Sequence, residues 1–125
     1  MTNSAKKKIL ITEDDGFLRD LTSIVLRKQG YEVAQARDGE EALEVVPTLM
    51  PDLILMDVNM PDVDGFTVAR RLRANPETAD IPIIFLTAHS QEKDRETGHA
   101  AGTAQYLTKP FDNKVLVDLI KQTLG

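Results

Sequence analysis

The 125-residue sequence contains no cysteine and no tryptophan. Without cysteine the chain can form no disulfide, and it has neither thiolate ligands for zinc nor a cysteine nucleophile. No apolar run is long enough to span a membrane, and the opening residues, MTNSAKKK, lack the apolar segment of a secretory signal. We therefore expect a cytoplasmic protein that does not insert into membranes.

Basic residues are also in short supply. The chain has 15 Lys and Arg against 20 Asp and Glu, which gives a net charge of −5 and a pI near 5.0. Binding to nucleic acid needs Lys and Arg clustered on one surface. The one basic run, at residues 6–8, is more simply explained as a solvated segment before the first strand. The charge balance argues against nucleic acid as a direct partner.

Short apolar runs alternate with helical patterns along the whole chain. Five runs have the composition of strands: 8–12, 31–36, 52–57, 81–88 and 103–109. Two of these, 52–57 and 81–88, are apolar enough to be buried, whereas 31–36 alternates as a half-exposed edge strand does. Helical patterns cover five further segments: 17–30, 38–46, 65–75, 91–102 and 113–124.

Three of the helical segments carry a further expectation. The first, 17–30, places four apolar side chains near one face: Leu18, Leu21, Ile24 and Val25. The second is expected to end before Pro47, because proline lacks the N–H that a helix interior needs. The fourth, 91–102, is polar and contains Gly98, so we expect it to be weak.

This alternation predicts an α/β fold in which a parallel sheet is covered by helices on both faces. Because crossover connections are right-handed, the leading topology is a doubly wound, flavodoxin-like (βα)5 fold with five parallel strands in the order 2-1-3-4-5. The length matches that of one compact domain. We expect a single domain over residues 1–125, without an output domain.

In this topology the carboxyl ends of the strands meet at one edge of the sheet, where ligands bind. Polar residues follow or end four of the predicted strands: Glu13, Asp14 and Asp15, then Asp57, then Thr87, then Lys109. An ionised carboxylate at the end of a buried strand is costly unless it is paired, metal-bound or protonated. Asp57 therefore predicts a site at this edge.

Each of these residues also has an ordinary structural explanation. Asp14 or Asp15 could cap the first helix, and we expect this role for Asp15. Thr87 and Lys109, taken singly, are typical of a strand end and a surface. Taken together, close carboxylates repel one another, and a magnesium ion bound by their oxygens relieves the repulsion. A metal pocket with a hydroxyl and an ammonium predicts a site for a phosphoryl group, with Asp57 as nucleophile or acceptor.

Four segments in this order, ILITEDD, LILMDVNMPDVDGF, IIFLTA and YLTKPF, resemble the receiver domains of two-component response regulators, the CheY-like family. The resemblance covers essentially the whole chain. It implies that a sensor histidine kinase or a histidine phosphotransfer protein phosphorylates Asp57 in the presence of Mg²⁺. The output is then a changed surface that a downstream protein recognises. The resemblance also implies that the chain assists its own phosphorylation and dephosphorylation but is not a dedicated enzyme.

The resemblance implies a metal site and a phosphorylation site that share Asp57. Asp14 would bind magnesium directly, Glu13 mainly through a water, and Asn59 through its backbone carbonyl. In this chain the first acid is Glu13, whereas the commonest family pattern has Asp, so the side chain is longer and its negative charge is the same.

A second group of residues would bind the phosphoryl group and respond to it. Thr87 would bind one phosphoryl oxygen, and Lys109, next to a cis bond to Pro110, would pair with another. Tyr106 matches the aromatic residue that turns inward when the Thr87 hydroxyl moves. His89 lies two residues after Thr87, as Asn59 lies two after Asp57, and these positions would tune dephosphorylation.

Two other classes of protein share parts of the pattern. An aspartyl-phosphate phosphatase or phosphotransferase usually has a second acid two residues after the nucleophile, where this chain has Asn59. A flavin-binding module needs a Ser/Thr/Gly-rich loop after the first strand, and the acidic loop TEDDGF would repel a phosphate. His99 has no role in the resemblance, and Met56 and Met60 are best explained as packing residues.

Overall fold

The computed structural model describes residues 6–88 and 105–125. Within them, five parallel strands form one sheet in the order β2-β1-β3-β4-β5, which confirms the predicted order and the α/β class. The strands are β1 (Lys8–Thr12), β2 (Glu32–Ala36), β3 (Leu53–Asp57), β4 (Ile83–Thr87) and β5 (Gln105–Thr108). As predicted, β2 is a half-exposed edge strand, and β3 and β4 are buried throughout.

The helices of the described residues are α1 (Gly16–Lys28), α2 (Gly39–Leu49), α3 (Gly65–Ala74) and α5 (Asn113–Leu124). The helix predicted at 91–102, together with His89, His99 and the first residues of the strand predicted at 103–109, lies outside the described residues. Among the helices that are described, none is long and apolar enough to cross a membrane.

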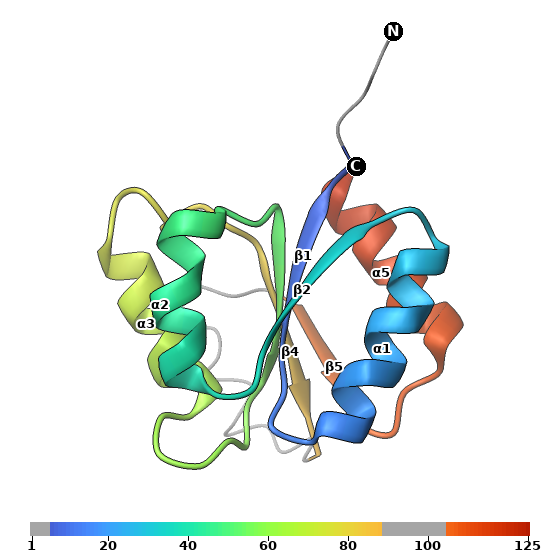
Figure 1. The fold of residues 1–125 in the computed structure, drawn as a ribbon, viewed down its shortest axis with the longest axis horizontal. Helices are drawn as coiled ribbons and strands as arrows, with labels where there is room; N and C mark the ends of the chain where they lie inside the picture. Colours follow the sequence, from blue (N-terminus) through green and yellow to red (C-terminus); the bar gives the residue numbers. More distant parts are fainter. Residues whose placement is uncertain (1–5, 89–104) are drawn as a thin grey trace, which may run out of the picture.

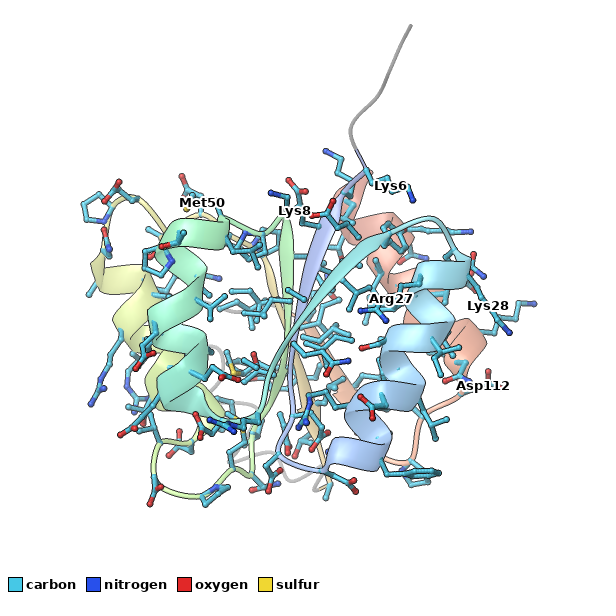
Figure 2. The ribbon with its side chains drawn as sticks, viewed as in Figure 1. Lys6, Lys8, Arg27, Lys28, Met50 and Asp112 are labelled. Carbon is cyan, nitrogen blue, oxygen red and sulfur yellow. The ribbon has the colours of Figure 1, made fainter. Side chains whose placement is uncertain are left out.

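Helices cover both faces of the sheet (Figure 1). On one face, α2 and α3 pack against a buried cluster that contains the side chains of Met56, Met60 and Phe85. On the other, α1 and α5 pack against a second cluster built around Leu55 and Leu86. Figure 2 shows side chains filling the space between the sheet and the helices on each side. The burial of Met56 and Met60 agrees with their predicted role in packing.

Each described helix begins at an aspartate whose carboxylate accepts a hydrogen bond from the backbone of the first turn. These caps are Asp15, Asp38, Asp64 and Asp112. Such caps satisfy N–H groups that have no partner inside the helix. The cap of α1 is Asp15, as expected, and not Asp14.

The prediction that the second helix ends before Pro47 is wrong, because α2 continues through Pro47 to Leu49. Pro47 lies in the last turn, so its missing N–H removes one hydrogen bond close to the end of the helix, while its fixed φ remains compatible with the helix. The half-buried Leu49 packs against the core from the added turn. The helix stops at Met50, where φ is 48° and the N–H still bonds to the Val46 carbonyl.

The first helix buries only part of the apolar face that its pattern indicates, since Leu18 and Val25 are half-buried. Leu21 and Ile24 are 45% and 49% exposed. The helix instead buries Thr22 and Ser23 beside Leu26, and both hydroxyls donate to carbonyl oxygens one turn earlier. Because these hydroxyls are satisfied within the helix, they can be buried at little cost.

Candidate functional site

Strand order determines which side chains meet at the carboxyl edge of the sheet. Glu13 directly follows β1 and Asp57 ends β3, and these two strands are neighbours. Thr87 ends β4 on the other side of β3, and Lys109 directly follows β5. The Lys109 N–H donates to the Thr87 carbonyl at 2.7 Å, which continues the pairing of β4 and β5 to the site.

Three carboxylates form a compact cluster at this edge. One oxygen from each of Glu13, Asp14 and Asp57 lies within 4.8 Å of the other two. Glu13 and Asp57 are only 2% and 3% exposed, whereas Asp14 lies at the open side of the cluster. Hard oxygen ligands without sulfur or imidazole are the donor set that magnesium prefers. The residues present therefore fit a divalent cation of this kind.

The ammonium of Lys109 compensates part of this negative charge. Its Nζ lies 2.7 Å from Oε1 of Glu13 and 3.5 Å from Oδ1 of Asp57. The bond from Lys109 to Pro110 is cis, which confirms what the resemblance implied for this position. Among residues 6–88 and 105–125, the one ammonium paired with these acids cannot neutralise three carboxylates, so this part of the site keeps an excess of negative charge that a cation would balance.

The buried setting of Asp57 changes its acidity. Burial, followed by a hydrogen bond and charge repulsion from Glu13, raises the pKa of Asp57 from 3.8 to about 7. The charge of Lys109 and the N–H of Asn59, 3.1 Å from Oδ1, oppose this rise. Burial alone would lower the pKa of Lys109, but its hydrogen bond to Glu13 and the charge of Asp57 raise it. Lys109 is therefore charged at neutral pH.

The loop after β3 returns closely to Asp57. The N–H of Gly65 donates to the Val58 carbonyl at 3.1 Å. A Cβ atom at Gly65 would lie 2.5 Å from the Asp57 carbonyl oxygen, so only glycine fits without a shift of the backbone. Asp62 has a φ of 67°, which aspartate tolerates better than most residues. This tight loop holds Asn59 next to the Asp57 carboxylate.

Two of the residues expected to respond to phosphorylation lie on the strands that follow Asp57 in the sheet. Thr87 is 2% exposed and borders Asp57 through the pairing of β3 and β4. Tyr106 is half-buried on β5, and its ring centroid lies 5.7 Å from that of Phe85. His89 lies outside the described residues, so its position relative to Asp57 is not described.

Two residues at this edge were missed by the sequence analysis. Arg19 donates from Nη1 to the Glu13 carbonyl at 2.7 Å, and its position one turn after the cap of α1 was the available signal. Thr12, directly before Glu13, is fully buried, and its Oγ1 has no hydrogen-bond partner among the residues that the structure describes. Nothing in the local sequence distinguishes Thr12 from an ordinary strand residue.

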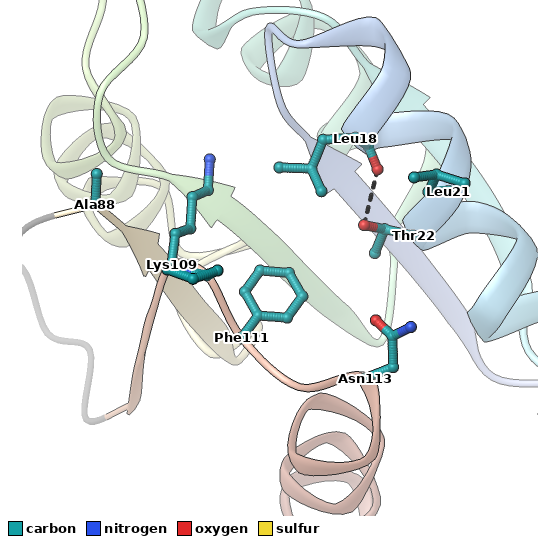
Figure 3. A pocket seen from close by; sticks show the side chains of 8 residues that line it. Leu18, Leu21, Thr22, Ala88, Lys109, Phe111 and Asn113 are labelled. Atoms are coloured by element: carbon teal, nitrogen blue, oxygen red, sulfur yellow. Dashed lines mark hydrogen bonds between the residues drawn. The ribbon is translucent and has the colours of Figure 1, made fainter.

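A cleft of about 450 Å³ opens beside Lys109, between α1 and the start of α5 (Figure 3). Its lining includes the apolar side chains of Leu18, Leu21 and Phe111. The aliphatic part of Lys109 borders this cleft, while its Nζ reaches Glu13 and Asp57. The polar cluster and the apolar cleft therefore adjoin at Lys109.

Comparison with known proteins identifies the family. Residues 9–121 match the response regulator receiver domain. The chain is 45% identical over 117 residues to the DNA-binding dual master transcriptional regulator RpaA of Synechocystis, which covers 94% of this chain and 48% of RpaA. It thus spans about half the length of the curated relatives that it matches first.

Solved structures of similar length agree with this match. The chemotaxis protein CheY4 of Vibrio cholerae superposes with a TM-score of 0.91 at 33% identity, covering 95% of this chain and 99% of that one. The receiver domain of the Pseudomonas aeruginosa sensor histidine kinase PA1611, solved with magnesium in its active-site cleft, gives 0.89 at 35% identity, with coverages of 97% and 99%. The chain belongs to the family of response regulator receiver domains.

Proposed function

We propose that the chain is the phosphoacceptor switch of a two-component phosphorelay and that Asp57 accepts the phosphoryl group. One observation carries the proposal: the buried Asp57 carboxylate lies 3.5 Å from the Lys109 ammonium and within 4.8 Å of carboxylate oxygens of Glu13 and Asp14. The carboxylate proposed as acceptor, an ammonium that would pair with the phosphoryl group and oxygen atoms that would bind a metal lie together at the carboxyl edge of the sheet. Receiver domains are generally not dedicated enzymes, and we assign this chain the same role.

In the proposed step, an oxygen of the Asp57 carboxylate attacks the phosphorus of a phosphohistidine on a histidine kinase or phosphotransfer protein. The bond from phosphorus to the imidazole nitrogen breaks, its electron pair stays on that nitrogen, and an aspartyl phosphate forms. Bound magnesium would supply positive charge to the transferring group. Its ligands in this chain would be Glu13, Asp14, Asp57 and the carbonyl of Asn59.

The remaining site residues would bind the phosphoryl group and transmit its arrival. Lys109 is already within reach of Asp57 and would exchange Glu13 for a phosphoryl oxygen. Thr87 would bind a second oxygen, and Tyr106 would follow the movement of Thr87. We also propose that Asn59 and His89 tune the loss of the phosphoryl group.

The wider setting is proposed on the same basis. Residues 1–125 would form one receiver domain that acts in the cytoplasm and signals to a downstream protein through its changed surface. The sequence gives no support for direct contact with nucleic acid, although several relatives that it matches are described as DNA-binding proteins. Those relatives are about twice as long as this chain.

Incubation with acetyl phosphate and magnesium chloride, followed by intact-mass measurement, tests the assignment. We expect a gain of one phosphoryl group that maps to Asp57 and is lost in Asp57→Asn. The matched control is Asp62→Asn, an exposed aspartate of the same loop, which should be phosphorylated as wild type is. Uptake by Asp57→Asn at the wild-type rate would contradict the acceptor assignment. Steady turnover of an added organic phosphate would instead indicate a phosphatase.

A further inference from the structure

We propose that Arg19 is a positioning residue that sets the metal affinity of the acidic cluster by holding the peptide unit between Glu13 and Asp14. The inference deepens the proposed function, because it assumes that this cluster binds a divalent cation. The guanidinium of Arg19 donates to the backbone carbonyl of Glu13 and to the Gln35 side chain, not to a carboxylate of the cluster. It acts on them through the backbone of the loop between β1 and α1.

The guanidinium joins this loop to the neighbouring strand. Arg19 Nη1 donates to the Glu13 carbonyl at 2.7 Å, and Nε donates to Oε1 of Gln35 on β2 at 3.2 Å. The Glu13 N–H donates in turn to the Ala36 carbonyl at 3.1 Å. The backbone of Glu13 is therefore held on both sides, by β2 directly and by α1 through Arg19.

The side chain of Arg19 is itself held by a closed set of hydrogen bonds. Gln35 Nε2 donates to Ser23 Oγ at 2.6 Å, and that hydroxyl donates to the Arg19 carbonyl at 3.0 Å. Ser23 is 1% exposed, so water competes little for these bonds. A long side chain normally loses much rotamer freedom when it is fixed. Here the neighbouring groups keep the guanidinium aimed at Glu13.

Planarity of the peptide bond passes this restraint to Asp14. The Glu13 carbonyl and the Asp14 N–H belong to one rigid plane. Rotation of that plane would move the Asp14 carboxylate relative to those of Glu13 and Asp57. Magnesium requires nearly ideal octahedral geometry, so its affinity is sensitive to small displacements of its ligands. Asp14 is the exposed member of the cluster and depends most on its backbone for position.

Calorimetric titration of the metal-free protein with magnesium chloride tests the inference. We expect Arg19→Ala to raise the dissociation constant on the order of tenfold, as loss of groups that orient metal ligands commonly does. Arg19→Lys should weaken binding too, because an ammonium does not reproduce the fork that spans Glu13 and Gln35. The matched control is Arg27→Ala, an exposed residue near the other end of α1, which should bind as wild type does (Figure 2).

A second measurement separates positioning from a general loss of stability. The rate of phosphorylation by acetyl phosphate should require more magnesium in the Arg19 variants and return close to the wild-type rate when magnesium saturates. An unchanged dissociation constant for magnesium in folded Arg19→Ala or Arg19→Lys would overturn the inference, even if urea unfolding showed that the variant is less stable. Arg19→Lys keeps the charge and the aliphatic stem, so it carries the test if the alanine variant does not fold.

The two proposals fail in different ways. If wild type binds magnesium and takes up phosphate while the Arg19 variants match it, the role of Arg19 is refuted and the proposed function stands. If wild type binds no magnesium, the metal site of the proposed function fails, and the role of Arg19 is refuted with it.

Discussion

Replacing Asp57 with Asn should stabilise the metal-free protein above neutral pH. The native state raises the pKa of Asp57 from 3.8 to about 7, chiefly because the carboxyl is buried and Glu13 lies beside it. The native state thus keeps a proton that the unfolded chain releases, so the stability contributed by this group falls as the pH rises from about 4 to about 7. Above that window the carboxylate is ionised in both the native and the unfolded state, and the native state bears the full free-energy cost of burying its charge beside Glu13. An amide at this position has no such cost.

The magnitude follows from the difference between the two pKa values. Subtracting 3.8 from about 7 leaves about three pH units, and at 1.36 kcal/mol per unit this corresponds to about 4 kcal/mol. Relaxation of the loop and entry of water reduce this figure, so we expect a gain of between about 1 and 4 kcal/mol at pH 8. At pH 5, about one unit into the window between the two pKa values, the gain should be less than half of that at pH 8.

Urea unfolding in EDTA at pH 5 and pH 8 measures the effect. Far-ultraviolet circular dichroism is the suitable signal, since the chain has no tryptophan. The control is Asp118→Asn, an exposed aspartate within α5, which should change stability little at either pH. The reasoning is refuted if Asp57→Asn is no more stable than wild type at pH 8, or if its advantage is the same at both values.

Magnesium should narrow the stability advantage of Asp57→Asn over wild type. A ligand that binds only the native state stabilises it by RT ln(1 + [L]/Kd), about 2.7 kcal/mol at a hundredfold excess over Kd. Wild type should show this gain, while Asp57→Asn, which has lost one carboxylate ligand, should gain little. An equal response of the two proteins to magnesium would remove Asp57 from the proposed metal site.

Three further substitutions test neighbouring parts of the site. Asp14→Asn should be slightly more stable than wild type in EDTA melts and gain little from magnesium, because it removes both repulsion and a ligand; lower stability in EDTA would argue against a metal role. Lys109→Ala should destabilise the metal-free fold by about 3 kcal/mol, since Glu13 and Asp57 lose their buried partner. The variant should still be phosphorylated, but the surface change that follows, measured by amide chemical shifts, should be lost. Thr12→Val should raise the free energy of unfolding by about 1 kcal/mol, because the buried Oγ1 has no partner to lose within the described part of the chain; a loss of stability would show that the hydroxyl is satisfied in solution.

Local chemistry made much of the fold predictable from the sequence. Apolar runs of strand length that alternate with helical patterns predict the parallel sheet, and the right-handed crossover rule then predicts the order that the structure has. The cap at Asp15 follows from its position before a helix. That Asp57 lies among charged partners could be predicted because an acid at the end of a buried strand needs compensation.

Other expectations failed where tertiary contacts outweigh local preference. The sequence pattern ended α2 before Pro47, but packing of the following turn against the core extends the helix to Leu49. The apolar pattern of α1 did not reveal that Leu21 stays largely exposed while Ser23 is buried. The end of a helix and the face that it buries depend on the surface against which it packs, and the sequence of the helix alone carries no information about that surface.

The sequence by itself determined which residues stand at the ends of the strands. Only the tertiary structure decided how they interact: Lys109 meets Glu13 at 2.7 Å across a separation of 96 residues. The hydrogen bond from Arg19 to the Glu13 carbonyl is likewise visible only in three dimensions, as is the lack of a partner for the Thr12 hydroxyl among the described residues. Periodicity and capping arise between residues close in the chain, whereas the energetics of a buried ion pair or hydroxyl depend on groups that folding brings from distant segments.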